Sequence, residues 1–282
     1  MEKSKKITIW GIILNSILFI AKLTVGLISN SLAVLSDAFN SLTDIVSSIG
    51  IFIAVKISNK KADSDHPFGH HRAEPLAGII VAILAGILGF EIIRTAIENL
   101  IDHKAIIIGN SAIIVLLFTI IVKLFMSYHF IRQGKELRSP AIKACGIDSR
   151  NDVFVSSIAL LGVVATKFGF VIFDDIAAFI IGLFIIYSGY KIGVENIDYL
   201  MGKSPPEEYI RKIIAIVKRI KGVKGLNSIK AHYVGSLIHI EIHIEVNKKL
   251  STQGSHEIGE NVRKKVEKLI DVDKAFIHID PR

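Results

Sequence analysis

Cysteine is nearly absent from this sequence. Its 282 residues include a single one, Cys145. One thiol excludes an internal disulfide, and it also excludes a cluster of thiolate ligands within one chain. A cleavable leader is not indicated either, because the apolar run after the basic start is too long and ends without a convincing small-residue cleavage motif. We therefore expect this run to remain as a first membrane span.

Apolar residues are abundant. They make up 51% of the chain, and the mean hydropathy of +0.50 is too high for a typical soluble domain. Six apolar segments approach the roughly 20 residues that a helix needs to cross a bilayer. They cover residues 7–28, 32–57, 75–100, 111–132, 144–168 and 171–195. Only residues 167–170 separate the last two segments, so a short re-entrant turn is an alternative there.

The net charge of +8 is unevenly distributed. Basic residues concentrate before the first segment and in every second loop, whereas the other short loops hold only Lys104 and Lys167. The concentrated set is Lys3, Lys5, Lys6, Lys56, Lys60, Lys61, Arg72, Arg132, Lys135, Arg138 and Lys143. Because basic loops stay on the cytoplasmic side, we expect both termini to be cytoplasmic. Much of the charge then serves topology, and no nucleic-acid partner is needed.

The sequence changes character after residue 202. Ser204–Glu208 are typical of a linker that leads into a helix start. Isoleucine and polar residues then alternate along 237–246, which predicts a strand with one buried face. The expected order is helix 206–220, strands 227–234 and 237–246, helix 254–270 and strand 274–280. We therefore predict an α-helical membrane protein with a six-span domain over 1–202 and a small cytoplasmic α+β, ferredoxin-like domain over 203–282.

Two polar pairs lie inside the apolar segments, Asn40 with Asp44 and Asp148 with Asp152. Their i, i+4 spacing places the two side chains of each pair on one helical face. An Asp at the bilayer centre costs about 2.5–3.5 kcal/mol, so three of them need a compensating partner. Three carboxylates and an amide carbonyl are hard oxygen donors, which suit Mg²⁺, Mn²⁺ or Fe²⁺ better than Zn²⁺. We interpret the four as a transport site for a divalent cation. The alternative is that they cap or pair helices and bind nothing.

Other charged residues in the segments are placed outside this site. Asp37, Asp174 and Asp175 lie near segment starts, where the membrane interface is expected to solvate them. Glu91 is deeper, and Arg94 three residues later is its expected partner.

Lys123 lies near the centre of the segment 111–132 and also needs a partner. We hypothesise that it pairs with one Asp of the transport site when the ion is absent. The alternative is that its long stem carries the ammonium to the interface.

Small residues recur along the segment 75–100. Small-xxx-small spacing allows helices to pack closely in lipid. The packing is either within one chain or between two copies. The residues are Gly78, Ala82, Ala85, Gly86 and Gly89.

Histidines and acids form two further patterns outside the segments. In the loop between the second and third segments, Asp63, His66 and His70 are close enough in sequence to bind a transition metal, although a solvated cytoplasmic turn fits equally well. The C-terminal domain holds a second set, and a polar, solvated sheet face explains it without a metal. This set is His239, His243, His256, His278 and Asp280.

The chain resembles the cation diffusion facilitators, a family of metal-ion/proton antiporters with six spans and a cytoplasmic ferredoxin-like domain. The resemblance covers nearly the whole chain. Its most specific stretches are Ser31–Asp44, His66–Glu74 and the pair Asp148 and Asp152. The resemblance implies a homodimer.

The family's transport site falls on Asn40, Asp44, Asp148 and Asp152. Zinc-type members usually carry His or Asp at the first of these positions and His at the third. The Asn and Asp found here resemble bacterial manganese-exporting members.

The resemblance also implies two cytoplasmic metal sites. The loop site falls on Asp63, His66 and His70, and the site of the C-terminal domain falls on His243, His256, His278 and Asp280. Two positions depart from the family pattern. Asn227 replaces a common His ligand, and Gly202 replaces an acidic residue that would pair with Arg72.

Together these patterns predict a plasma-membrane efflux transporter that exchanges cytoplasmic Mn²⁺ for protons by alternating access. Fe²⁺ and Zn²⁺ are alternative substrates. The Asp carboxyls would carry the protons, and the C-terminal domain would sense metal and support dimerisation. We expect no enzymatic activity and no prosthetic group. Rival interpretations are a passive divalent-cation channel, a membrane metalloenzyme and a metal-responsive scaffold.

Overall fold

The computed structural model describes residues 2–58, 60–102, 109–136, 140–235 and 237–282. Within these ranges the chain forms eight helices and three strands. They belong to two compact units. The first comprises Met1–Gly50 and Ile80–Gly193, and the second comprises Ile51–Ile79 and Val194–Arg282. Two basic residues used for the orientation argument, Lys104 and Arg138, lie outside the described residues.

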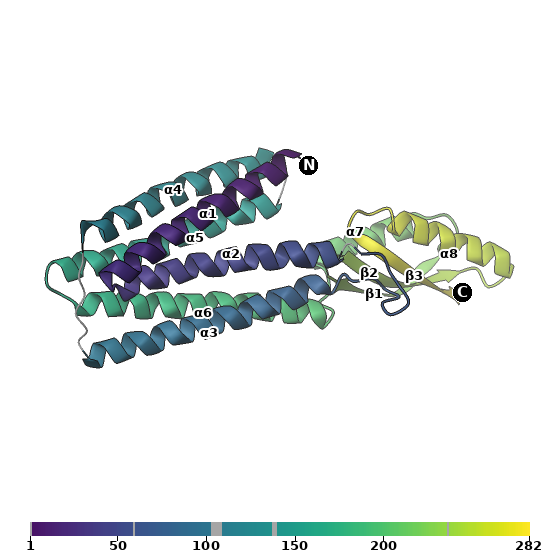
Figure 1. The fold of residues 1–282 in the computed structure, drawn as a ribbon. Coiled ribbons are helices and arrows are strands. Elements are labelled where there is room, and N and C mark those ends of the chain that lie inside the picture. The colour runs from purple at the N-terminus through teal and green to yellow at the C-terminus, as the bar shows by residue number, and fades with distance from the viewer. Residues whose placement is uncertain (1, 59, 103–108, 137–139, 236) are drawn as a thin grey trace. The chain divides into compact units, whose positions relative to one another are not determined.

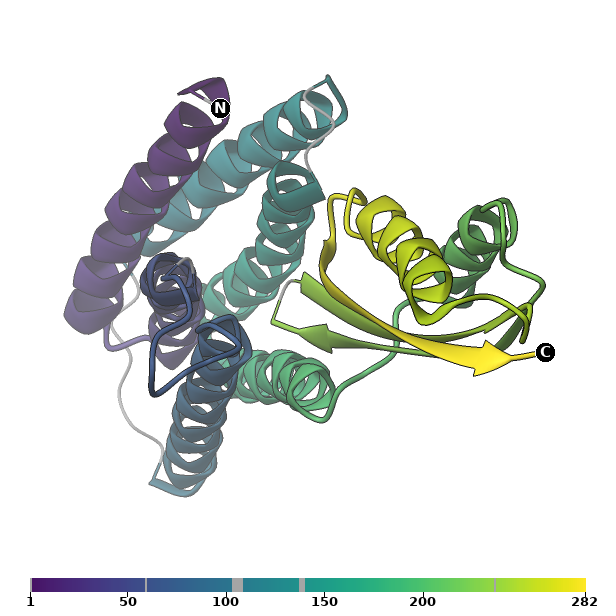
Figure 2. The same ribbon diagram turned by 90° about the vertical axis from the view of Figure 1, so that its right-hand side faces the viewer.

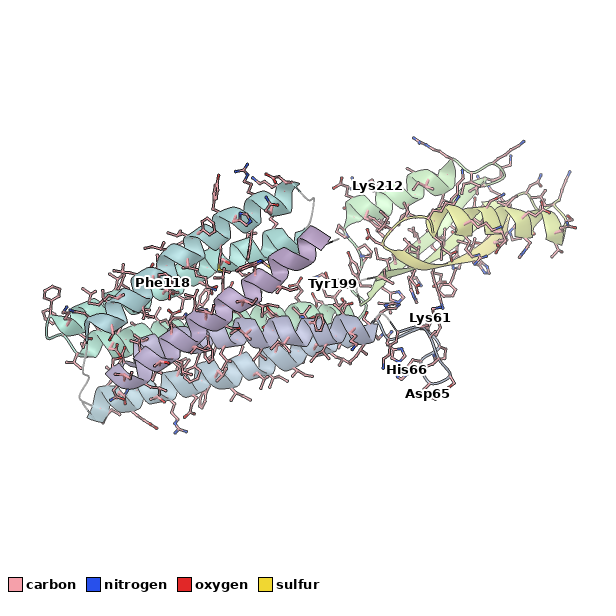
Figure 3. The ribbon with its side chains drawn as sticks, turned by 45° about the horizontal axis from the view of Figure 1, so that its top comes forward. Lys61, Asp65, His66, Phe118, Tyr199 and Lys212 are labelled. Carbon is pink, nitrogen blue, oxygen red and sulfur yellow. The ribbon has the colours of Figure 1, made fainter. Side chains whose placement is uncertain are left out.

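Six long helices correspond to the six apolar segments, as predicted (Figure 1). They are α1 (Glu2–Ser29), α2 (Leu32–Ser58), α3 (Ala73–Asp102), α4 (Asn110–Glu136), α5 (Pro140–Lys167) and α6 (Ile172–Leu200). By length and composition, all of them except α5 qualify as membrane spans within the described part of the chain. Asp148, Arg150 and Asp152 make α5 less apolar than the others. Apolar side chains such as Phe118 on α4 project from the helices and remain exposed (Figure 3).

The first unit has an apolar core made of small and branched residues from α2, α3, α4, α5 and α6. Helices α3 and α6 approach each other closely within it. A methyl group added at Gly89 would lie 2.9 Å from the Gly182 carbonyl oxygen, and one added at Gly189 would lie 3.1 Å from the Ala82 carbonyl oxygen. Much of the small-residue pattern of residues 75–100 therefore serves packing within the chain. Gly86 is different, because a methyl group there would meet nothing within 4 Å.

The start of α6 corrects one prediction. Asp174 is fully buried and not solvated at an interface. Its carboxylate accepts hydrogen bonds from the Ser31 hydroxyl at 2.5 Å and from the backbone N–H groups of Leu32 and Ala33 at 2.7 and 3.2 Å. An acid at a helix N-terminus satisfies free N–H groups and favours the helix dipole. Asp174 therefore caps α2. Asp175 is also buried, and Asn99 donates a hydrogen bond to it at 3.2 Å.

A tight turn joins α5 to α6. Gly169 has φ +97°, a left-handed value that glycine adopts without strain. The N–H groups of Gly169 and Phe170 donate to the carbonyl oxygens of Thr166 and Ala165. The two helices are thus separate elements that reverse direction at this turn.

The second unit contains the predicted α+β domain, with its elements in the expected order (Figure 2). Strand β2 pairs with β1 in antiparallel and with β3 in parallel orientation. Helices α7 and α8 cover one face of the sheet, and the alternating isoleucines of β2 are buried beneath them, as the sequence pattern predicted. The elements are α7 (Glu207–Lys218), β1 (Gly225–Val234), β2 (Leu237–Val246), α8 (Thr252–Val266) and β3 (Val272–Pro281).

His239 departs from the pattern of β2. It lies on the polar face, yet it is only 5% exposed. Nε2 of its ring forms a 2.9 Å hydrogen bond with the Asp273 carboxylate. The centroids of its ring and of the Phe68 ring lie 6.0 Å apart. The segment between α2 and α3 therefore contributes to covering this strand position, which the strand alternation alone does not reveal.

Gly202 follows the end of α6 with φ +82°. Hydrogen bonds from the N–H groups of Gly202 and Lys203 to the carbonyl oxygens of Tyr199 and Asp198 close the last helical turn. A left-handed residue after a helix is usually glycine. The helix ending thus explains why glycine fits this position and an acidic residue would be strained there.

Candidate functional site

The structure brings the two predicted polar pairs together in the first unit. The Asn40 side-chain amide on α2 donates a 2.9 Å hydrogen bond to Oδ1 of Asp152 on α5. Asp44 interacts electrostatically with both Asp152 and Asp148. We call Asn40, Asp44, Asp148 and Asp152 the quartet. The spacing places each pair on one face of its helix, and the hydrogen bond from Asn40 to Asp152 joins the two faces.

The quartet is buried at one end and open at the other. Asn40 and Asp152 are buried, Asp44 is half-buried and Asp148 is exposed. The Oδ2 atom of Asp44 is buried and has no hydrogen-bond partner among the residues that the structure describes. A buried carboxylate oxygen without a partner is costly, and a cation would satisfy it. The donor set and this free acceptor together fit a hard divalent cation.

Lys123 completes the surroundings of the quartet. It is fully buried on α4, and its ammonium donates a hydrogen bond to Oδ2 of Asp152. The predicted pairing of Lys123 with an Asp of the site is found with Asp152, and its dependence on the absence of the ion stays a prediction. The ammonium does not reach the interface.

A second buried ion pair, Lys22 with Asp37, lies one helical turn from the quartet and was not predicted from the sequence. The Lys22 ammonium on α1 donates to Oδ1 and the carbonyl oxygen of Asp37, both at 2.9 Å, and to the Ser41 hydroxyl at 2.7 Å. The Ser156 hydroxyl donates to the other carboxylate oxygen of Asp37 at 2.8 Å. The prediction that Asp37 is solvated at the interface is wrong, because this residue is fully buried and paired.

Spacing along the chain offered the one signal for this pair. Asp37, Asn40, Ser41 and Asp44 follow each other at helical spacing on α2, and Ser156 lies four residues after Asp152 on α5. The polar face of each helix is therefore longer than the quartet. By contrast, the predicted pair of Glu91 and Arg94 is exposed on α3, at 3.4 Å.

The predicted loop site forms a cluster in the second unit. Asp63, His66 and His70 offer ligand atoms that all lie within 4.8 Å of one another. The backbone N–H of His66, at 2.7 Å, and its ring lower the pKa of Asp63. In the described part of the chain, Nδ1 of His70 is buried and has no hydrogen-bond partner. Two imidazoles and a carboxylate are suitable ligands for a transition metal.

Three of the four residues predicted for the C-terminal domain site also come together. His243 on β2 is paired in register with His278 on β3, and Asp280 follows on the same strand face. Their ligand atoms lie within 4.8 Å of one another. Asn227 donates to Asp280 at 3.2 Å, so it lies beside this cluster. His256 on α8 is exposed and lies outside it.

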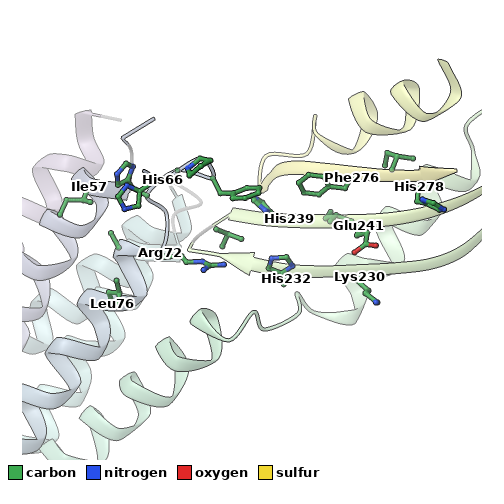
Figure 4. Close-up of a pocket in the computed structure, with 18 residues that line it drawn as sticks. Ile57, His66, Arg72, Leu76, Lys230, His232, His239, Glu241, Phe276 and His278 are labelled. Atoms are coloured by element: carbon green, nitrogen blue, oxygen red, sulfur yellow. The ribbon is translucent and has the colours of Figure 1, made fainter. Parts of the chain in front are cut away.

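The second unit also contains a cavity of about 1030 Å³ (Figure 4). His66 and His70 line it from the segment between α2 and α3, and His232, His239 and Phe276 line it from the sheet. Burial and the neighbouring His239 lower the pKa of His232. The loop cluster therefore faces a space large enough to admit solvent and ions.

Comparison with known proteins identifies the family. Residues 8–201 match the description "Cation efflux transmembrane domain" and residues 205–282 match "Cation efflux protein, cytoplasmic domain". The chain belongs to the cation diffusion facilitator family. An uncharacterized transporter of Methanocaldococcus jannaschii is 34% identical over 99% of this chain and 99% of its own length.

Two similar facilitators come from Bacillus subtilis. The manganese efflux system protein MneS is 30% identical over 92% of this chain and 89% of its own. The manganese efflux system protein MneP is 30% identical over 99% of this chain and 96% of its own. A solved structure, MamM-CTD, is 27% identical, covers 27% of this chain and 98% of its own, and has a TM-score of 0.26. As a cation diffusion facilitator, the chain is a multi-pass membrane transporter for metal efflux.

Proposed function

We propose that this facilitator exports Mn²⁺ from the cytoplasm in exchange for protons, with the quartet as its transport site. The observation that carries the proposal is the donor set itself, which consists of oxygen atoms from Asn40, Asp44, Asp148 and Asp152 with one buried acceptor left free. Oxygen donors without imidazole or thiolate favour Mn²⁺ over the stronger competitor Zn²⁺. Two Bacillus subtilis relatives that are manganese efflux proteins support the same ion.

Proton coupling follows from the chemistry of the same side chains. Three carboxylates close together repel one another, so an empty site favours protonation of at least one of them. Metal entry then displaces protons, and protons from the other side displace the metal after the site changes its exposure. Alternating access around a fixed site within the helices provides that change.

We further propose a plasma-membrane location with both termini in the cytoplasm, on the basis of the basic loops. The segment between α2 and α3 and the α+β domain then lie in the cytoplasm, where the clusters at Asp63 and His243 sense the metal concentration. The family's cytoplasmic domain supports a homodimer. Removing His243 and His278 together should change the dependence of transport on metal concentration, and an unchanged dependence would contradict the sensor role.

Reconstitution into proteoliposomes tests the function directly. We expect uptake of Mn²⁺ to exceed that of Zn²⁺ and Co²⁺, and to depend on an imposed pH gradient. Fe²⁺ uptake, measured under reducing conditions, decides between the two oxygen-preferring ions. Flux that is insensitive to the pH gradient would identify a passive channel instead, and binding without flux would identify a scaffold.

Variants of the quartet test the assignment of the site. Asp44→Asn and Asp152→Asn remove one charge each at nearly constant volume, and each should abolish Mn²⁺ flux while the protein still inserts. Glu91→Gln on α3 is the matched control, because Glu91 is exposed and, among the described residues, its carboxylate pairs with Arg94 of its own helix alone. Mn²⁺ flux retained in both Asp variants would exclude the quartet as the transport site.

A double exchange tests the role of ligand hardness. Asn40→His together with Asp148→His introduces nitrogen donors that Zn²⁺ prefers. We expect the ratio of Zn²⁺ to Mn²⁺ transport to rise. An unchanged ratio in a folded, active variant would show that these two positions do not set the ion preference.

A further inference from the structure

The buried lysine beside the quartet has no role in the function proposed so far. Lys123 is fully buried, and its ammonium contacts Oδ2 of the carboxylate whose Oδ1 accepts the Asn40 amide. It also interacts electrostatically with Asp44. A positive charge therefore already lies among the ligands that a metal ion would use.

This ammonium is held by few contacts. Within the described part of the chain, Asp152 is the one hydrogen-bond acceptor that contacts Lys123. The other buried lysine, Lys22, has an acceptor for each of its three N–H groups. A lysine head on a flexible four-carbon stem can leave a single acceptor without any change of the backbone.

The formal charges show what such a displacement would achieve. When metal is bound and its entry has displaced the protons, Asp44, Asp148 and Asp152 carry three negative charges and Lys123 one positive charge, which leaves −2 before the metal is counted. A divalent cation brings this sum to zero. Without Lys123, the same ion would leave an excess charge of −1 at the quartet. Charges in a medium of low dielectric interact strongly, so this difference affects how tightly an ion is held.

We propose that Lys123 is a tethered cation that occupies the transport site when metal is absent and competes with the metal ion for Asp152. The inference rests on the function proposed above. The competition lowers the affinity of three carboxylates to a value that permits release, which a transporter needs as much as binding. It also matches the charge of the site to a divalent ion. Lys123 thus acts as a positioning and affinity-setting residue, and it is not itself a ligand.

Equilibrium binding of Mn²⁺ to the purified full chain, at one fixed pH, tests the competition. Removing a competing cation should tighten binding, whereas removing a structural support should weaken it. We expect Lys123→Met to lower the dissociation constant by about tenfold or more, because the competing charge lies at hydrogen-bond distance from a ligand. Lys123→Arg keeps the charge and should remain within about threefold of the unchanged protein. The saturating Mn²⁺ uptake rate of Lys123→Met should fall, since release becomes slower.

Lys123→Gln provides a second form of the test if the methionine variant does not fold. It retains a donor for Asp152 but has no charge, so it should also tighten binding. Equal or weaker Mn²⁺ binding in a folded, monodisperse Met or Gln variant would overturn the inference. So would an arginine variant that behaves like the methionine variant.

Two controls separate the possible outcomes. The double variant Lys22→Met with Asp37→Asn removes the neighbouring ion pair as a whole and should leave the Mn²⁺ affinity unchanged. Tightening in this control equal to that of Lys123→Met would show a general effect of removing a buried ion pair near the quartet and contradict the inference. Asp44→Asn combined with Asp152→Asn measures the share of binding that belongs to other sites. If this last variant binds and transports like the unchanged protein, the proposed transport site fails, independently of the behaviour of Lys123.

Discussion

Two lysines are fully buried among the helices of the first unit, and they are held in different ways. Lys22 meets three acceptors on α2, and its partner Asp37 receives a further hydrogen bond from Ser156 on α5. Lys123 contacts one acceptor, Asp152, which also belongs to the predicted metal ligands. We call the first network closed, because each N–H group of Lys22 and both carboxylate oxygens of Asp37 have partners. We call the second network open, because its carboxylate, that of Asp152, is also one of the proposed metal ligands.

The difference shows how a membrane protein can use the same pair of residue types for two purposes. A buried ion pair is stable only when its geometry and its remaining hydrogen bonds are well satisfied. The network around Lys22 meets that condition and links α1, α2 and α5 one turn from the quartet. The pair at Lys123 meets it less completely. Incomplete satisfaction is what allows a substrate ion to replace the ammonium.

The largest expected effect distinguishes the two networks by stability. Lys22→Met leaves the carboxylate of Asp37 buried without a cation, so it should lower the free energy of unfolding by about 3–5 kcal/mol. Lys123→Met should cost less, because Asp152 keeps the Asn40 amide as a donor and belongs to a quartet that is open to solvent at the exposed Asp148. Unfolding of both variants in mixed detergent micelles measures the comparison. Equal losses of stability in Lys22→Met and Lys123→Met would show that the network around Lys22 is held no more firmly than the pair at Lys123.

The double variant Lys22→Met with Asp37→Asn is the control for this prediction. It removes both charges, and replacing a complete buried pair is often nearly neutral. Most of the stability lost in Lys22→Met should therefore return. A double variant as unstable as the single one would mean that packing of the Lys22 stem, not an unpaired carboxylate, causes the loss.

A smaller effect is expected at Ser156, which donates the hydrogen bond that closes the first network. Ser156→Ala leaves one oxygen of Asp37 without its donor, which should cost about 1–3 kcal/mol. Within the described ranges, the hydroxyl of the adjacent Ser157 donates only to the carbonyl oxygen of Val153 in its own helix, so Ser157→Ala should change stability by no more than about 0.5 kcal/mol. The same unfolding assay compares the two. Similar values for both serines would show that the bond to Asp37 contributes little.

Local spacing was sufficient to place each polar pair of the quartet on one face of its helix, but it did not predict the hydrogen bond that joins Asn40 to Asp152 across α2 and α5. The i, i+4 pairs on α2 and α5 place their side chains on one helical face regardless of how the helices pack. The alternation along β2 worked for the same reason, since it depends on neighbours within one strand. Glu91 with Arg94 is likewise a contact within one helix turn.

The contacts that the sequence did not reveal join distant residues. Lys22 and Asp37 are on different helices, and Asp174 caps a helix that begins 142 residues earlier in the chain. Position near a segment start indicated interfacial solvation for both acids, but depth in the molecule depends on neighbouring helices. The prediction of a solvated position for His239 failed for the same reason, because Asp273 and Phe68 from other elements cover its ring.

The smallest expected effect extends the comparison to an exposed carboxylate outside the helices. Asp63 is about half-exposed, and the backbone N–H of His66 donates to it at 2.7 Å, which lowers the pKa of Asp63. The unfolded segment therefore takes up the proton first as the pH falls. The contribution of this bond is complete above the ordinary Asp pKa of about 3.9 and is lost as the pH falls through the lower folded value.

Hydrogen-exchange protection of the His66 amide measures this effect. Protection should stay constant from about pH 7 to about pH 5 and then decrease in more acidic solution, below the ordinary Asp pKa. Asp63→Asn keeps an acceptor without a charge, so its protection should be lower throughout and should show no acid step. Protection that stays constant below the ordinary Asp pKa would show that the bond to the His66 amide does not depend on the charge of Asp63. In that case the contrast with Asp37, whose carboxylate is paired with Lys22, would rest on exposure alone.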